Sequence, residues 1–289
     1  MAKTYPTTPM CDGELLRRFE PTARDSDVFI TTTPKCGQTW LQTLLFHIKT
    51  AGRMPDFGGV GLGGVSPWLE IPADFGVGPT WSSPEERLAQ FEALPDPRVF
   101  KLHVIWDEVP RPPGSKSKVI TITRDPRDVP YSMFSHMQAM KPSQKMSTPS
   151  EFDPFFEEWL ERGLYFQFID SFWQHKDDPS FLWLRYEDLQ RDLRAETSRI
   201  LAFLGWKVAA EDLERALPLV DFEHLRATEK SQVFSHAVSR FKDEGRFFRE
   251  GGMGKNRARL SEDQQQRLLA RLRATLPEAC CARVLALDA

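Results

Sequence analysis

The stretch from Val28 to Leu41 constrains the fold of this chain most, because it combines a strand, a tight loop and the start of a helix. It begins as a short apolar, β-branched run, which is typical of a buried parallel strand. Pro34 and Gly37 then break the run and mark a tight loop. After the loop, apolar side chains recur at helical spacing, at Trp40, Leu41, Leu44, Leu45 and Ile48. This spacing predicts a helix over residues 40–50 that begins near residues 37–39, with His47 as a structural or surface residue.

A strand, a glycine-bearing loop and a helix N-terminus together form a site that can bind an anion. The first backbone N–H groups of a helix have no partners within it, and the helix dipole favours negative charge near them. Lys35 adds a cation and Thr39 adds a hydroxyl. The loop does not have the G-x-x-x-x-G-K-[ST] order of a Walker A loop, because Lys35 precedes Gly37. An ordinary strand, loop and helix with a solvated lysine is the alternative interpretation of this loop taken alone.

Composition places the chain among ordinary globular proteins. It has 289 residues, of which 40% are hydrophobic and 27% charged, enough for one large α/β domain or two small ones. The net charge of −3 gives no global attraction to nucleic acid or to an anionic membrane. Any anion site must therefore be a local cluster of lysine and arginine. No apolar run approaches ~20 residues, and the first residues have no apolar signal region, so we expect neither a transmembrane helix nor a signal peptide.

The cysteines predict neither a metal site nor a disulfide framework. Cys11, Cys36, Cys280 and Cys281 form no C-x-x-C pair and no ligand spacing with histidine. We therefore expect a reducing cytoplasmic location without a structural metal or disulfide. Because the chain contains no internal repeat and no linker between two cores, we expect a single domain over residues 1–289.

Two further predicted strands end in side chains that can act on an anion. The strand over residues 97–103 ends in Lys101 and His103, which strand alternation puts on one face about 6–7 Å apart. The strand over residues 118–123 runs into Arg124, and Ser132 follows eight positions later on the next helix. Ligands gather at the carboxyl ends of parallel strands, and an arginine fork matches phosphate oxygens. The alternatives are a structural histidine and a solvated arginine that offsets the aspartates of its turn.

The remaining segments give a coarse element order. Residues 1–26 read as a loop or edge that leads into the first strand, and the glycine- and proline-rich residues 52–84 read as a long mobile loop without regular elements. Residues 152–172 have helical, strongly aromatic periodicity, and residues 141–154 form another loop. Helices are also expected at residues 84–94, 193–204, 211–217 and 261–276, and a strand with a turn at residues 180–189.

Five motifs, in order over roughly residues 28–265, resemble the cytosolic-type sulfotransferases, which use 3′-phosphoadenosine 5′-phosphosulfate (PAPS) as sulfuryl donor. Residues 32–40 are similar to the family's phosphosulfate loop, with Cys36 where serine is usual and Gln38 where threonine is usual. Lys101-x-His103 and the Arg124/Ser132 pair match two further motifs.

The other two motifs concern the adenine and the 3′-phosphate. Tyr-Glu-Asp-Leu at residues 186–189 is similar to a hallmark whose tyrosine lies beside the adenine, and residues 220–225 align with an adenine segment of which Phe222 is retained. Residues 249–257 resemble a glycine-rich loop that folds over the cofactor. Glu250 replaces its lysine, so we expect the Glu250 side chain to point outward, with Lys255 or Arg257 restoring the charge.

The resemblance implies a role for each matched residue. Lys35 would neutralise charge on the bridging oxygen of the donor, Lys101 would face the sulfuryl oxygens, and His103 would accept the proton of the acceptor. The implied cofactor-binding residues are Lys35, Cys36, Gly37, Gln38, Thr39 and Trp40 around the 5′-phosphate, Arg124, Ser132, Arg249, Glu250 and Gly251 at the 3′-phosphate segments, and Trp40, Tyr186 and Phe222 around the adenine. No metal is implied.

The implied fold is a single α/β domain with a central parallel sheet flanked by helices and a P-loop-like strand, loop and helix. The implied reaction moves the sulfuryl group of PAPS to a hydroxyl or amine of a small acceptor, expected to be phenolic or another aromatic or apolar alcohol, and leaves 3′,5′-adenosine bisphosphate (PAP). Loops at residues 52–84, which include Ser66-Pro67-Trp68-Leu69-Glu70, and at residues 141–154 would flank the acceptor. Neither nucleic acid nor membrane is an expected partner, and the oligomeric state stays open.

Two alternatives remain. A P-loop kinase that uses ATP would need Mg²⁺ ligands and a Walker A lysine with its serine or threonine, which the loop does not offer. A catalytically silent nucleotide-binding or scaffold protein would have no need of Lys35, Lys101 and His103, all of which are present.

Overall fold

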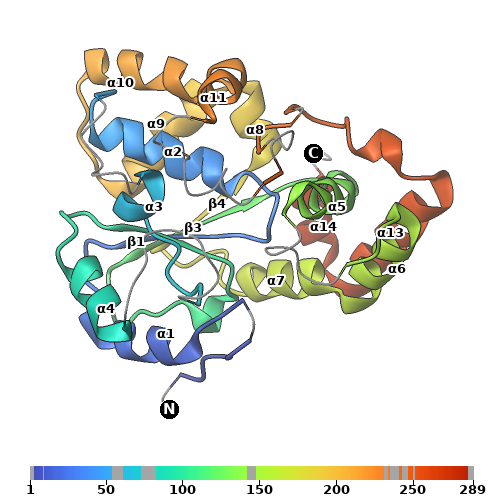
Figure 1. Cartoon of the computed structure of the whole chain (residues 1–289), viewed down its shortest axis with the longest axis horizontal. Coiled ribbons are helices and arrows are strands. Elements are labelled where there is room, and N and C mark those ends of the chain that lie inside the picture. Colours follow the sequence, from blue (N-terminus) through green and yellow to red (C-terminus); the bar gives the residue numbers. More distant parts are fainter. Residues whose placement is uncertain are drawn as a thin grey trace.

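Four parallel strands form one central sheet in the order β2-β1-β3-β4. The computed structural model describes residues 3–8, 10–53, 61–72, 83–141, 148–230, 234, 241–242, 247–249 and 251–285. The strands are β1 (Val28–Thr31), β2 (Val99–Leu102), β3 (Lys118–Thr123) and β4 (Phe181–Arg185). Figure 1 shows helices on both sides of this sheet, so the predicted central parallel sheet is confirmed.

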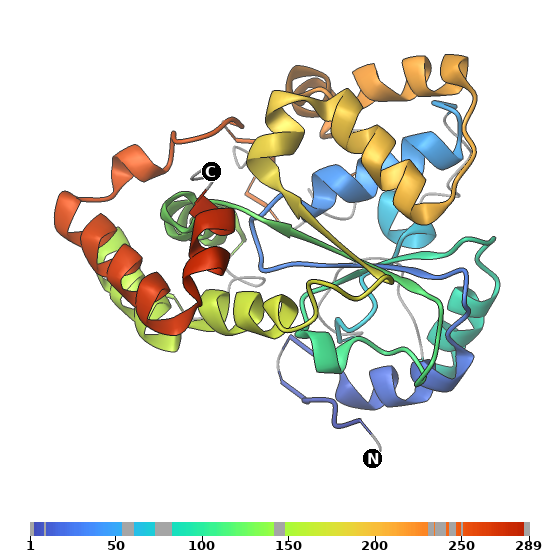
Figure 2. The same ribbon diagram turned by 180° about the vertical axis from the view of Figure 1, so that it is seen from behind.

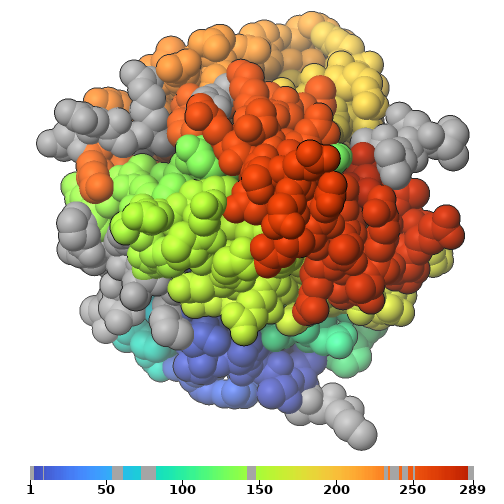
Figure 3. Space-filling model, turned by 90° about the vertical axis from the view of Figure 1, so that its right-hand side faces the viewer, coloured from blue at the N-terminus to red at the C-terminus, as the bar shows by residue number. Residues whose placement is uncertain are grey.

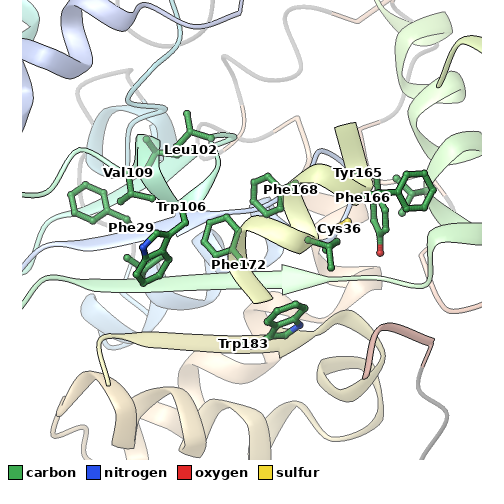
Figure 4. Packing of buried hydrophobic residues seen from close by; sticks show 14 of the residues in the cluster. Phe29, Cys36, Leu102, Trp106, Val109, Tyr165, Phe166, Phe168, Phe172 and Trp183 are labelled. Atoms are coloured by element: carbon green, nitrogen blue, oxygen red, sulfur yellow. The ribbon is translucent and has the colours of Figure 1, made fainter. Parts of the chain in front are cut away.

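The two faces of the sheet bury two different hydrophobic clusters. On one face, Val28 and Ile30 pack with α2 (Gln38–Lys49), α8 (Tyr186–Arg191), α9 (Leu193–Leu204) and α10 (Ala210–Ala216). On the other face, Phe29 and Phe100 pack with α1 (Gly13–Phe19), α4 (Pro84–Glu92) and α7 (Leu164–Trp173); Figure 4 shows part of this cluster. This alternation along β1 is what a strand buried on both faces requires.

The C-terminal part of the chain packs beside the sheet. Helix α13 (Glu262–Thr275) contacts α6 (Phe152–Arg162), where Gln264 donates to Asp153, and α14 (Glu278–Leu285) returns toward the sheet. Figure 3 shows the C-terminal residues directly against those of α6 and α7. Helices α5 (Val129–Ala139), α11 (Phe222–Thr228) and α3 (Gly61–Val65) complete the surroundings of the site. Of the helices that the structure describes, none is both long and apolar enough to cross a membrane.

Most predicted elements are confirmed, three predictions are wrong in part, and one helix, α14, was not predicted. Residues 13–19 form α1 instead of a loop, because Leu15, Leu16 and Phe19 share one buried face and Asp12 caps the first turn. The predicted loop over residues 52–84 contains the short helix α3, while residues 54–60 and 73–82 lie outside the described residues. The aromatic helix of residues 152–172 is two helices, broken at Gly163, whose φ is 62°. Helix α14 follows the predicted terminal helix.

Candidate functional site

The phosphosulfate loop (residues 32–40) turns tightly between β1 and α2. Gly37 precedes α2 with a φ of 102°, in the left-handed region that favours glycine. A Cβ atom at Gly37 would lie 2.8 Å from Cδ2 of Tyr186. The loop can therefore approach Tyr186 only because residue 37 has no side chain. This contact brings together two predicted motifs that are far apart in the sequence.

The buried side chains of Cys36 and Gln38 hydrogen-bond to the loop and to the neighbouring strands. The Cys36 thiol is buried, with its Sγ 2.9 Å from Thr33 Oγ1. Gln38 Nε2 donates to the carbonyl oxygens of Ile30 at 2.7 Å and Leu102 at 2.6 Å. Both side chains are buried, so residues 36–40 can offer to an anion their backbone N–H groups and the hydroxyl of the half-buried Thr39. The family's usual serine and threonine are not needed for that backbone arrangement.

Lys35 lies at the centre of a group of cations. Its Nζ is 3.2 Å from Nδ1 of His136, on α5, and 5.3 Å from the ring centroid of Phe247. Burial, together with the smaller effects of the charges on Arg124, Lys101 and Arg249, lowers the pKa of Lys35 to about 7. These predicted residues are therefore close enough to act on one another. A site with so many cations and a partly neutral lysine is suited to a ligand that carries several negative charges.

Arg124 connects three predicted segments. Its guanidinium carbon lies 4.5 Å from the ring centroid of Tyr186, and its Nη1 and Nη2 donate to the carbonyl oxygens of Lys35 at 3.5 Å and Gly252 at 3.1 Å. Tyr165 donates from its hydroxyl to the Arg124 carbonyl at 2.6 Å. Ser132, one turn into α5, is half-buried.

The glycine-rich loop (residues 249–257) is fixed by a buried carboxylate. Asp128 accepts from the backbone N–H groups of Gly254 at 2.7 Å, Asn256 at 3.1 Å and Arg257 at 2.8 Å, and it pairs with Arg124 at 3.7 Å. Arg249 donates from Nη2 to Asn256 Oδ1 at 2.5 Å. Glu250 lies outside the described residues, so its predicted outward orientation is not described by the structure.

Of the three predicted adenine residues, two contact each other and the third contacts this loop. Trp40 packs edge-on against Tyr186, with ring centroids 5.6 Å apart, and donates from Nε1 to the Val220 carbonyl at 2.8 Å. Gly251 has a φ of 61°, and a Cβ there would lie 2.6 Å from the Phe222 ring. The backbone of the glycine-rich loop therefore packs against Phe222, so the Phe222 and Gly251 motifs are neighbours in the structure.

His103 follows β2 with its imidazole fixed in one tautomer. Its Nδ1 lies 2.6 Å from the carbonyl oxygen of Thr32. A carbonyl can only accept, so we assign the proton to Nδ1, which leaves the lone pair on Nε2. Although His103 keeps part of its surface exposed, burial lowers its pKa to about 3, with smaller contributions from Lys101 and Lys35. A neutral imidazole with a free Nε2 is the form that can accept a proton.

Lys101 and His103 share one face, as predicted, together with a tryptophan. Lys101 Nζ lies 4.2 Å from the ring centroid of Trp68, and the Trp68 and His103 rings meet edge-on with centroids 5.1 Å apart. Trp68 belongs to the segment predicted to flank the acceptor. Residues 142–147 of the second acceptor loop lie outside the described residues.

Two residues of the site were not predicted from the sequence. Asp128 orders the glycine-rich loop, and His136 contacts Lys35. The only sequence signal for His136 is its spacing, one helical turn after Ser132 on the same helix. Asp128 lies four positions after Arg124, within the motif that contains Arg124 and Ser132.

Comparison with known proteins agrees with this geometry. The sulfotransferase domain family model matches residues 25–278. An amine sulfotransferase from Oryctolagus cuniculus is 28% identical over 262 residues, which cover 88% of this chain and 81% of the relative. The structure of mouse sulfotransferase SULT7A1 complexed with PAP has a TM-score of 0.73 at 20% identity, covering 98% of this chain and 96% of that chain. Retinol dehydratase in a complex with retinol and PAP has a TM-score of 0.68 at 24% identity, covering 89% and 82%.

The solved structures share the fold, and the family model covers most of the chain together with the motifs that meet in the site. The chain therefore belongs to the sulfotransferase family, and it is a PAPS-dependent enzyme that transfers a sulfuryl group.

Proposed function

We propose that the enzyme transfers the sulfuryl group of PAPS to a hydroxyl or amino group of a small organic acceptor, with His103 as the base and without a divalent metal. The observation that carries this proposal is the position of His103. Nδ1 of His103 bonds to the carbonyl of Thr32, the first residue of the phosphosulfate loop, so Nε2 carries no proton. The charges of Lys101 and Lys35 both act on the imidazole. The base and the anion-binding loop thus share one edge of the sheet.

The residues divide the reaction between them. The bond from sulfur to the acceptor oxygen or nitrogen forms while the bond from sulfur to the bridging phosphate oxygen breaks, and the proton of the acceptor passes to Nε2 of His103. Lys35 stabilises the charge that grows on the bridging oxygen, and Lys101 stabilises the charge on the sulfuryl oxygens. Negative charge on the bound donor offsets the cations that lower the pKa of His103. Donor binding therefore raises this pKa and makes His103 a stronger base.

Cofactor binding uses the segments that the site brings together. Backbone N–H groups of residues 36–40 hold the 5′-phosphate. Arg124, Ser132, Arg249 and Gly251 hold the 3′-phosphate, and the aromatic rings of Trp40, Tyr186 and Phe222 enclose the adenine. The contacts among Arg124, Tyr186 and the glycine-rich loop support this assignment, because they bring the three segments together at one place.

The acceptor is proposed to be a phenolic or another aromatic or apolar alcohol, or an amine. The half-buried Trp68 beside His103 supports an aromatic or apolar acceptor. The relative from Oryctolagus cuniculus is named an amine sulfotransferase, and the retinol dehydratase structure contains retinol. Both names support a small organic molecule as the acceptor.

The experiment is a transfer assay with radiolabelled PAPS and a panel of phenols, steroids, amines and sugars, run in EDTA. Transfer in EDTA is expected, and activity that returns only with Mg²⁺ would argue against the metal-free mechanism. His103→Ala should lower the rate about 10²–10⁴-fold, while calorimetry should show nearly unchanged PAP binding. Near-wild-type transfer by His103→Ala would remove His103 from the mechanism. Joint loss of PAP binding and thermal stability would instead make it a structural histidine.

A further inference from the structure

Residues 67–70 run beside β2 and extend the sheet at its edge. The backbone N–H of Lys101 donates to the Pro67 carbonyl at 2.9 Å, and the N–H of Leu69 donates to the Lys101 carbonyl at 2.9 Å. Trp68 and Lys101 form a parallel bridge. The residues two positions further along each chain are Glu70 and His103, which therefore lie on the same face. The pairing thus places a carboxyl group level with the proposed base.

The next backbone N–H on this edge, that of His103, donates to a side chain instead of a backbone carbonyl. The parallel pattern predicts that the N–H of His103 donates to the carbonyl of Leu69. That carbonyl instead accepts from Nη2 of Arg87, at 3.0 Å. The N–H of His103 donates to the Glu70 carboxylate, with 2.6 Å between N and Oε1. A titratable side chain, in place of the sheet backbone, therefore holds the main chain of His103.

The same carboxylate oxygen fixes an aromatic neighbour of the base. Nε1 of Trp68 donates to Oε1 of Glu70 at 2.6 Å. The Trp68 ring packs edge-on against the His103 ring and lies under the Lys101 ammonium. Hydrogen bonds to an ionised acceptor are the short, strong ones. One oxygen thus orders both the backbone of His103 and the ring that contacts its imidazole.

This arrangement costs stability that a structural role would not require. Glu70 is 1% exposed, and burial raises its pKa to about 7, against the hydrogen bonds from Trp68 and His103 and the charge of Lys101. Arg87 on α4 is close enough for its charge to interact with Glu70, and burial, with a smaller effect of the charge of Glu70, raises the pKa of the Cys11 thiol near α1. Its second oxygen, Oε2, has no hydrogen-bond partner among the described residues. A buried, half-satisfied carboxyl group is unfavourable, and such groups collect at functional sites.

We infer that Glu70 is a positioning residue for the base His103, an inference that rests on the proposed transfer reaction. Glu70 acts through the N–H of His103 and through the indole of Trp68. By holding the main chain of His103, it keeps Nδ1 within 2.6 Å of the Thr32 carbonyl and so keeps the lone pair on Nε2. Without Glu70, the main chain of His103 is released and the imidazole loses its fixed tautomer.

The first test compares substitutions of Glu70 with a matched control. Glu70→Ala should lower kcat at saturating substrates about 10–100-fold, since a small displacement of a reacting group costs rate on this scale, and PAP affinity should stay unchanged. Glu70→Gln keeps an oxygen acceptor and should recover most of the rate. Glu70→Met keeps the volume without an oxygen, and it replaces Glu70→Ala if that variant does not fold. In the control, Glu108→Ala, the lost carboxylate accepts from the N–H of Ile105 at 3.3 Å, and transfer should be unchanged.

The second test separates positioning from a general loss of structure. In a His103→Ala background, Glu70→Ala should cause no further loss of transfer, because the two residues act as one unit. NMR of ¹⁵N-labelled histidines should show a single Nδ1–H tautomer of His103 in the wild type and mixed tautomers in Glu70→Ala. Additive losses, or an unchanged tautomer with wild-type kcat, would overturn the inference. The NMR result does not depend on turnover, so failure of the proposed reaction would be seen separately, as absence of transfer by the wild type.

Discussion

The guanidinium carbon of Arg124 lies 4.5 Å from the ring centroid of Tyr186. The residue assigned to the 3′-phosphate and the residue assigned to the adenine therefore contact each other directly. A cation over an aromatic face is attracted to the ring, so each side chain fixes the other. Under the proposed assignment, this contact would make recognition of the 3′-phosphate and of the adenine interdependent.

Arg124→Ala should weaken PAP binding by roughly 10–150-fold, because a charge-assisted contact is worth ~1.5–3 kcal/mol. Binding of adenosine 5′-phosphosulfate, which has no 3′-phosphate, should change much less. Calorimetry with both ligands measures the difference. The control is Arg127→Ala, since Arg127 makes its ion pair with Asp125, at 2.6 Å. Equal weakening of both nucleotides by Arg124→Ala would show that Arg124 is structural.

Binding of PAP should take up a proton through Lys35. Burial and neighbouring cations lower the pKa of Lys35 to about 7, so much of it is neutral at pH 8. A bound anion favours the ammonium and raises that pKa. Calorimetry at pH 8 in buffers of different ionisation enthalpy should therefore report uptake approaching one proton per PAP. Lys35→Gln should abolish the uptake, whereas Lys116→Gln, at an exposed position, should not. The same uptake in Lys35→Gln would assign the proton to another group.

His47 should make the free energy of unfolding decrease as the pH falls. It is 4% exposed, and burial, with a smaller effect of His224, lowers its pKa to about 4. The unfolded chain, with a histidine pKa of ~6.5, then binds more protons than the folded chain between the two values. The stabilising contribution is present above pH ~6.5 and is lost as the pH falls toward 4, on the order of 2–3 kcal/mol.

The measurement is denaturant unfolding of the wild type and His47→Gln from pH 7.5 to 4. Their difference in unfolding free energy should shrink as the pH falls, because only the wild type loses this contribution. His224→Gln, on an exposed neighbour, is the matched control. A difference that is constant with pH would contradict the assignment.

Gly251→Ala should displace the glycine-rich loop and weaken PAP binding about tenfold or more. The new Cβ would lie 2.6 Å from the Phe222 ring, in a backbone conformation that already disfavours a side chain. Gly114→Ala is matched to it, because Gly114 has a φ of 79° with no atom within 4 Å of the added Cβ. That control should lose about 1 kcal/mol of stability and keep its PAP affinity. Phe222→Leu should partly restore binding to Gly251→Ala by making room for the methyl group. Equal PAP affinity of the two alanine variants would refute the contact.

The sequence predicted those parts of the site that depend on short-range pattern. The apolar run before Pro34 and the helical spacing after Gly37 are local, so β1, the loop and α2 could be placed, and strand alternation put Lys101 and His103 on one face. Helix α1 was missed because its seven residues carry too few apolar positions to show a period.

Contacts between distant segments could not be predicted in this way. Asp128 and Gly254 are 126 positions apart, and Lys35 and His136 are 101 positions apart. The sequence indicated Glu70 only as part of a segment that flanks the acceptor. Its role depends on Arg87 taking the carbonyl of Leu69, which no periodicity reveals. The sequence did not predict the residues that hold the predicted site residues in place, such as Asp128, His136 and Glu70, because tertiary packing determines those contacts.

Gln38 has a consequence for how the two substrates meet. Its amide joins the carbonyl of Ile30 in β1 to the carbonyl of Leu102, the residue immediately before His103. The start of α2 and the segment that carries His103, the proposed base, are thereby held to the ends of the same two strands. The distance between the phosphosulfate loop, which would hold the donor, and His103 is accordingly set by the sheet. Acceptors whose nucleophilic atom reaches the space between His103 and the phosphosulfate loop should be preferred. An acceptor that is too short to place its nucleophilic atom there should bind without reacting.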